Sequence, residues 1–157
     1  MRAMFAGGVR LESRKGATER LRIVELAPPA LAVTPLQQHV GLISRALVKP
    51  GDFVMRGQKI GEAEGFVAAH VHASIAGKVT AVSLQPHPMG TAVEAVVIEN
   101  DGTDAPASCE THSWETSTPE ALRGLVREAG IVGLGGATFP THVKLDPPKA
   151  KKIDALV

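Results

Sequence analysis

The stretch Val48-Lys49-Pro50-Gly51-Asp52-Phe53-Val54-Met55-Arg56-Gly57-Gln58-Lys59-Ile60 decides the fold class. Its Pro-Gly-Asp sequence predicts a tight turn, after which Phe53 and Val54 are expected to pack into a core. Its Arg-Gly-Gln sequence then turns the chain into a strand that carries Ile60. After an intervening hairpin, residues 72–79 (His-Ala-Ser-Ile-Ala-Gly-Lys-Val) turn again into a strand. This two-part pattern predicts a small, mainly β structure.

Short β segments flank these two units along the chain. Turn residues separate the segments, and many short strands at close spacing predict a small barrel or sandwich. Aromatic residues make up only 3% of the chain and Tyr is absent, so the core is expected to consist of Val, Ala, Ile and Leu. The expected strands are 30–33, 44–48, 58–62, 69–73, 77–82 and 93–98.

The sequence changes character after a linker rich in Ser, Thr, Asp and Pro. Thr118 is the expected N-cap of a helix with Pro119 at its first position, and Gly130 is expected to end that helix in the left-handed conformation. A glycine-rich stretch follows, and residues 152–157 are expected to begin a strand. These elements cannot bury their apolar faces alone, so we expect the chain to be a fragment. The expected division is a β domain with an N-terminal extension at 1–108, a linker at 109–117 and the incomplete start of an α/β domain at 118–157.

The two-part β pattern resembles the barrel-sandwich hybrid of biotinyl and lipoyl carrier domains. Carrier domains place a modifiable lysine at an exposed hairpin tip between the two halves. The corresponding tip here is residues 62–66 (Glu-Ala-Glu-Gly-Phe), which contains no lysine, and Lys59 lies within an expected strand. The resemblance therefore implies the fold, and a carrier function is the least favoured alternative.

A longer series of motifs, spread along the whole chain, resembles the RnfC family. Members of this family are subunits of the Rnf electron-transport complex. The sodium-pumping quinone reductase has a related subunit, but His39-Val40-Gly41 and Pro86-His87-Pro88 favour the RnfC family. The resemblance implies a mainly β barrel-sandwich hybrid domain followed by the start of an α/β flavin-binding domain. The motifs that carry it are residues 7–9, 35–41, 50–60, 72–77, 86–88 and 98–102.

Residues 130–145 (Gly-Ile-Val-Gly-Leu-Gly-Gly-Ala-Thr-Phe-Pro-Thr-His-Val-Lys-Leu) are the most informative stretch for function. Glycines let a ligand approach the backbone closely, and successive N–H groups in such a loop can form a nest for phosphate. Lys144 could add an ammonium group. The stretch follows a helix rather than a strand, so it lacks the context of a Rossmann fingerprint. From the residues alone, a structural turn is an equal alternative.

The string Gly-x-Gly-Gly-Ala-x-Phe-Pro-Thr-x-x-Lys is similar to the flavin loop in the FMN- and NADH-binding subunit of respiratory complex I, and to the matching loop of the RnfC family. The resemblance implies that the loop binds FMN, with Lys144 contacting it and Phe139 near the adenine of NADH. Leu134 departs from the common Arg, and Thr138 and His142 stand where glycines are usual. The implied cofactor-binding residues are Gly133, Leu134, Gly135, Gly136, Ala137, Phe139 and Lys144.

Other kinds of site find little support in the sequence. The net charge is +1 and the basic residues form no stripe along the sequence, which argues against nucleic-acid binding. No apolar run approaches the ~20 residues needed to insert in a membrane. Cys109 is the single cysteine, so this chain alone cannot hold a [4Fe–4S] cluster. No acid–base or nucleophile arrangement indicates a catalytic residue. His39, His70 and His72 suggest either a metal site or hydrogen-bonded imidazoles, and the lack of further ligands at suitable spacing favours the imidazoles.

The Rnf resemblance implies an electron-transfer subunit that in full length exchanges electrons between NAD(H) and ferredoxin through FMN and [4Fe–4S] clusters. It would lie peripherally on the cytoplasmic face of the bacterial inner membrane, attached through other membrane subunits of the complex. The clusters would belong to a part of the protein beyond these residues, and the 157-residue fragment is expected to be inactive in NADH oxidation. The alternatives are a non-catalytic docking or assembly module of that complex and a biotinyl- or lipoyl-type carrier domain.

Overall fold

The computed structural model describes residues 12–135, 137–148 and 150, and they form a mainly β structure, as expected. The strand expected at 152–157 lies outside the described residues. The described strands are β1 (Leu31–Pro35), β2 (Arg45–Ala46), β3 (Phe53–Val54), β4 (Lys59–Glu62), β5 (Val71–His72), β6 (Gly77–Pro86) and β7 (Ala92–Asn100). A 3₁₀ turn, η1 (Lys15–Ala17), precedes them, and the helices α1 (Pro119–Glu128) and α2 (Thr141–Lys144) follow.

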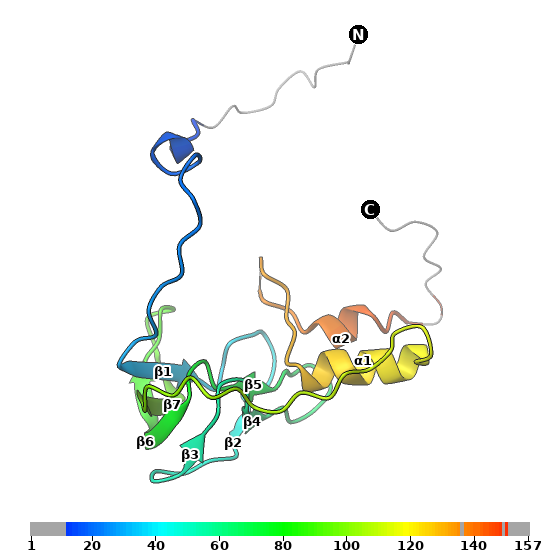
Figure 1. Cartoon of the computed structure of the whole chain (residues 1–157). Helices are drawn as coiled ribbons and strands as arrows, with labels where there is room; N and C mark the ends of the chain where they lie inside the picture. Colours follow the sequence, from blue (N-terminus) through cyan, green and yellow to red (C-terminus); the bar gives the residue numbers. More distant parts are fainter. Residues whose placement is uncertain (1–11, 136, 149, 151–157) are drawn as a thin grey trace.

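The strands form two antiparallel sheets. One sheet has the order β1-β7-β6-β3, and the other has the order β2-β4-β5. The hairpin of β6 and β7 is the longest pairing, from Gly77 opposite Asn100 to Pro86 opposite Ala92, with a register shift between Val79 and Ala81. Figure 1 shows the two sheets side by side, with the helices beyond the three-stranded sheet.

The core lies between the sheets and consists of aliphatic side chains. β7 is the central strand on which it is built, because every residue from Ala95 to Ile98 is buried. Gly51, in the predicted tight turn, has φ +99°, a conformation that glycine adopts without strain. The buried cluster comprises Leu36, Val54, Ile60, Val71, Ala73, Ile75, Val79, Val96 and Ile98.

Two sequence-based expectations for the strands need correction. Phe53 was expected in the core, but 69% of its surface is exposed, whereas Val54 is buried. Successive side chains of a strand point to opposite faces, so only one of these two neighbours in β3 can face the core. The strands expected at 44–48 and 69–73 are each only two residues long, as β2 and β5.

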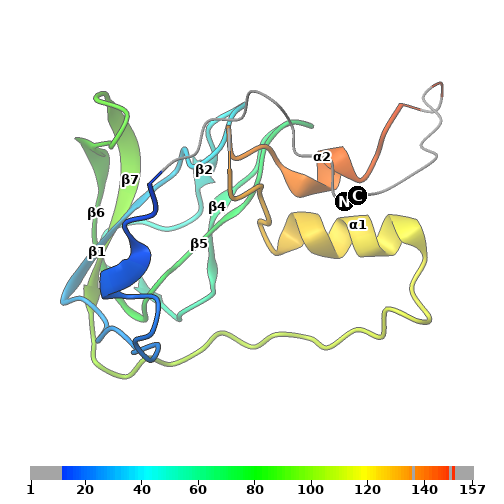
Figure 2. The same ribbon diagram turned by 90° about the horizontal axis from the view of Figure 1, so that it is seen from above.

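Both helices lie beside the three-stranded sheet. In Figure 2, α1 and α2 run side by side next to β4 and β5, on the side away from β6 and β7. The chain between β7 and α1 passes along the outside of the molecule before it turns back into α1. Both helices thus lie on the β4–β5 side of the molecule.

Candidate functional site

Helix α1 delivers the chain to the glycine-rich stretch, and local sequence sets both of its ends. The hydroxyl oxygen of Thr118 accepts a hydrogen bond from the backbone N–H of Ala121 at 3.2 Å, which confirms the expected N-cap. Gly130 has φ +65°, as expected for the residue that ends the helix. A Cβ on Gly130 would collide with the carbonyl oxygen of His70, so glycine lets the helix end close to β5.

The glycine loop, residues 133–139, is closed at its base by backbone pairing. Val132 and Pro140 form an antiparallel bridge. The N–H of Gly133 donates a hydrogen bond to the carbonyl oxygen of Phe139 at 3.0 Å. This backbone pairing holds together the two ends of the glycine loop, between α1 and α2.

Two of the predicted cofactor-binding residues, Gly133 and Lys144, come together. A Cβ on Gly133 would lie 2.5 Å from Nζ of Lys144, so the missing side chain leaves room for the ammonium group. Gly135 is exposed, and a Cβ there would meet nothing within 4 Å. The ammonium group lies beside Gly133 and the open backbone is at Gly135, and both a cation and a free loop backbone suit an anionic group such as a phosphate.

The other predicted residues of the loop are less closely gathered. Leu134 is fully exposed, Ala137 is exposed, and Phe139 is half-buried. Gly136 lies outside the described residues. The loop thus presents an apolar side chain to solvent at the position where the related flavin loops commonly have Arg.

The opposite side of the glycine loop contacts a loop that precedes β2. The N–H of Val40 donates to the carbonyl oxygen of Ala137 at 3.1 Å, and the hydroxyl of Thr138 donates to the carbonyl oxygen of Gln38 at 2.9 Å. Next to these contacts is a cavity of about 550 Å³, whose other wall includes His87. Residues of both sequence motifs that favoured the RnfC family therefore line one cavity together with residues of the glycine loop.

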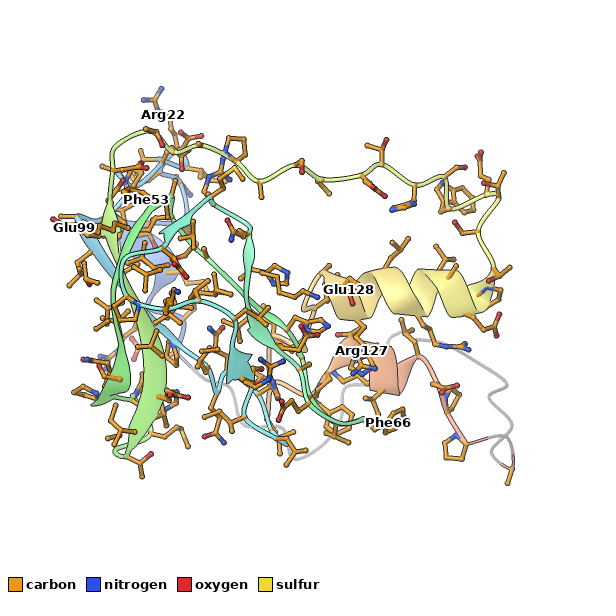
Figure 3. All side chains as sticks on the ribbon, turned by 90° about the horizontal axis from the view of Figure 1, so that it is seen from below. Arg22, Phe53, Phe66, Glu99, Arg127 and Glu128 are labelled. Carbon is orange, nitrogen blue, oxygen red and sulfur yellow. The ribbon has the colours of Figure 1, made fainter. Side chains whose placement is uncertain are left out.

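A cluster of charged and titratable side chains joins α1 to β4 and β5. The Nζ of Lys59 is 2.8 Å from one carboxylate oxygen of Glu128 and 3.8 Å from Glu62. The second carboxylate oxygen of Glu128 is 3.4 Å from Nε2 of His70, whose side chain is almost fully buried. Figure 3 shows Glu128 at the end of α1, where the helix approaches the strands.

A backbone hydrogen bond to the His70 ring indicates the tautomer of its neutral form. Its Nδ1 accepts the N–H of Ala63 at 3.0 Å, so the neutral ring carries its proton on Nε2, which faces Glu128. Burial, and next the nearby charge of Lys59, lowers the pKa of His70. The hydrogen bond from Lys59 lowers the pKa of Glu128, which keeps this carboxylate ionised. The cluster is thus an ion pair beside a neutral, buried imidazole.

The three histidines of the metal hypothesis do not share a site. His39 uses both ring nitrogens on the backbone: Nε2 accepts the N–H of Ala69 at 3.0 Å, and Nδ1 lies 3.0 Å from the carbonyl oxygen of Val40. Within residues 12–135, 137–148 and 150, no three His, Cys, Asp or Glu side chains are close enough to hold a metal ion. Burial and the neighbouring His70 lower the pKa of His72.

Contacts of the β4–β5 loop, residues 63–70, were not anticipated from the sequence. A guanidinium N–H of Arg127 donates to the carbonyl oxygen of Gly65 at 3.1 Å, and Nε2 of His142 donates to the carbonyl oxygen of Phe66 at 3.1 Å. The ring of Phe66 meets that of His142 edge to face, and Figure 3 shows Phe66 near Arg127. These partners are more than 60 residues apart, and no local pattern signals their contact.

Comparison with known protein families places this geometry in context. Residues 3–103 match the family model of the RnfC barrel sandwich hybrid domain. The chain belongs to this family. Residues 126–157, which include the glycine loop, match the model of the Nuo51 FMN-binding domain. These matches confirm both the RnfC resemblance and the barrel-sandwich hybrid fold class.

Curated relatives of this RnfC family member belong to ion-translocating oxidoreductase complexes. The chain is 44% identical over 155 residues to the RnfC-type subunit of the Na⁺-translocating ferredoxin:NAD⁺ oxidoreductase complex of Acetobacterium woodii, covering 98% of this chain and 35% of that protein. It is 40% identical over 156 residues to the counterpart from the proton-translocating complex of Clostridium ljungdahlii, covering 98% and 34% respectively. The counterpart from the ion-translocating oxidoreductase complex of Rhodobacter capsulatus is 40% identical over 151 residues, covering 89% and 28%. The chain thus spans about a third of the length of these relatives.

The helices in the described part of the chain are short. None of them combines the length and the hydropathy that crossing a membrane requires.

Proposed function

We propose that this chain is the N-terminal part of an electron-transfer subunit that, in full length, exchanges electrons between NAD(H) and ferredoxin through FMN and iron–sulfur clusters. The names of the relatives support the reaction, because two of them belong to ferredoxin:NAD⁺ oxidoreductase complexes. The observation that carries the proposal is the match of residues 126–157 to an FMN-binding domain, since this range includes Gly133 and Lys144. The protein would be peripheral on the cytoplasmic face of the bacterial inner membrane and would bind other membrane subunits of the complex.

The domain division that we propose keeps the boundaries expected from the sequence. Residues 1–108 would form the barrel-sandwich hybrid domain with its N-terminal extension, 109–117 the linker, and 118–157 the start of the FMN- and NADH-binding domain. The iron–sulfur clusters require cysteines from outside these residues, because Cys109 is the single cysteine here.

The proposed flavin site is the glycine loop with Lys144, and the implied set is Gly133, Leu134, Gly135, Gly136, Ala137, Phe139 and Lys144. The role of Lys144 is to place a positive charge beside the loop backbone at Gly133, where a phosphate or a ring oxygen of the cofactor can accept its hydrogen bonds. The open face of Gly135 would let the cofactor approach the backbone. When bound, FMN would supply the hydride and electron chemistry, while the protein binds and orients it.

A titration of FMN into the full-length protein tests this proposal. Lys144→Met keeps the length of the side chain and removes its charge, so the dissociation constant for FMN is expected to rise about tenfold, equivalent to ~1.4 kcal/mol. Lys78→Met is the matched control, because Lys78 is an exposed lysine on β6, outside the glycine loop. If Lys144→Met binds FMN as tightly as the control does, Lys144 does not contact the cofactor.

A further inference from the structure

Thr138 has an unusual backbone conformation for its residue type. Its φ is +50°, in the left-handed region that glycine favours and that a β-branched residue rarely adopts. Such a conformation persists only when neighbouring contacts hold it in place, and it is concentrated at functional sites. The related flavin loops usually have glycine at this position, which would adopt the same φ without strain. Unlike glycine, threonine has a side chain that can form a contact at this position.

The hydroxyl of Thr138 makes that contact. It lies 2.9 Å from the carbonyl oxygen of Gln38 and 2.7 Å from that of Ala137, and its single proton can point to either oxygen. The bond to Gln38 spans 100 residues of sequence. Beside it, the N–H of Val40 donates to the carbonyl oxygen of Ala137 at 3.1 Å. The N–H of Val40, together with the hydroxyl of Thr138 when its proton points to Gln38, thus joins the glycine loop to residues 37–40.

Residues 37–40 are themselves firmly anchored. The side-chain amide of Gln38 donates to the carbonyl oxygen of Pro35 at 2.9 Å. His39 is buried, and its Nε2 accepts the N–H of Ala69 at 3.0 Å. A contact to this segment therefore fixes the glycine loop relative to the β structure.

We propose that Thr138 is a positioning residue: its hydroxyl ties the glycine loop to the 37–40 segment of the barrel-sandwich hybrid and so sets the shape of the loop that receives the cofactor. The part of this inference that concerns cofactor affinity depends on the proposed function. The tie itself does not, because it is a contact between two parts of this chain.

Amide hydrogen exchange in the full-length protein tests the tie. Thr138→Val removes the hydroxyl but keeps the β-branched shape, so the hydrogen-bonded amides of Val40 and Gly133 are expected to exchange about tenfold faster. Thr138→Ser keeps the hydroxyl and should restore slow exchange. Thr116→Val, in the segment before α1, is the control and should leave these amides unchanged. Unchanged exchange in Thr138→Val, or equally fast exchange in Thr138→Ser, would overturn the inference.

FMN titration of the same variants separates the tie from the proposed function. The dissociation constant is expected to rise about tenfold in Thr138→Val and to return to the original value in Thr138→Ser. Faster exchange with unchanged FMN affinity would show that the tie does not position the cofactor. If the unmodified full-length protein binds no FMN, the proposed function fails, and the exchange experiment still decides whether the tie exists.

Discussion

Removing the ion pair between Lys59 and Glu128 is predicted to weaken the attachment of α1 to the three-stranded sheet. The perturbation consists of Lys59→Met, Glu128→Gln and the double variant. The two charged groups are 2.8 Å apart, and the side chains of Lys59 and Glu128 are 29% and 61% exposed. Neither substitution removes much volume, so the change in stability reports the loss of charge.

The expected magnitude follows from this partial exposure. Exposed ion pairs contribute ~0.2–1 kcal/mol, and the limited exposure of Lys59 places this pair toward the upper end, at about 0.5–1 kcal/mol. Glu128→Ala is expected to cost about 1 kcal/mol more, because Nε2 of the buried His70 would lose the carboxylate oxygen that it faces at 3.4 Å. The matched control is the pair of Arg45 and Glu64, which has the same 2.8 Å separation but exposures of 58% and 57%. Its coupling energy is expected to be below about 0.5 kcal/mol.

Urea unfolding of the 157-residue chain measures these energies. A double-mutant cycle at each pair gives the coupling energy, and both cycles are repeated in about 1 M NaCl, where exposed charges are screened. The Lys59–Glu128 coupling is expected to exceed that of the control pair and to lose less of its value in salt. A coupling energy no larger than that of Arg45 and Glu64 would refute the view that this ion pair holds the helix.

Two further predictions concern pH and the core. Burial lowers the pKa of His70 and His72 below 6.5, so the unfolded chain binds more protons than the folded chain as the pH falls through that value. The free energy of unfolding, measured by urea titration, is therefore expected to be full above about pH 6.5 and to fall toward pH 5.5. This fall is expected to be smaller in His70→Asn than in His112→Asn, which is the control at an exposed histidine. A free energy of unfolding that does not change with pH would contradict the prediction. In the core, Ile98→Ala is expected to destabilise the chain by ~2–5 kcal/mol because Ile98 is fully buried, and Phe53→Ala by less than about 1 kcal/mol because Phe53 is exposed. Equal losses in thermal or urea unfolding would mean that Phe53 packs into the core after all.

The sequence predicted those features that short stretches of chain determine. The helix cap at Thr118 depends on a side chain and a backbone N–H three residues apart, and the helix end at Gly130 depends on the freedom of glycine alone. The strands β6 and β7 were also expected, although their pairing as a hairpin was not predicted and β6 continues to Pro86, past the predicted end at Val82. Phe53 was misplaced because hydrophobicity alone does not say which of two neighbouring strand residues faces the core.

The surroundings of the candidate site could not be predicted in this way. The residue types of the glycine loop and Lys144 pointed to a ligand, and the structure brings Gly133 and Lys144 together. The contacts that hold the loop, from Thr138 to Gln38 and from Arg127 to the β4–β5 loop, join residues 100 and 62 positions apart. Such pairings depend on how the sheets pack, which no local pattern encodes.

The most direct test of the central claim compares two glycine substitutions in FMN titrations of the full-length protein. Gly135→Ala and Gly124→Ala each add a methyl group that meets nothing within 4 Å in this structure, so neither should disturb the fold. Gly124 lies in the middle of α1, where alanine is favourable. If the cofactor lies against the glycine loop, Gly135→Ala is expected to weaken FMN binding at least about tenfold while Gly124→Ala leaves it unchanged. Equal FMN affinity in the two variants would contradict the assignment of the flavin site to this loop.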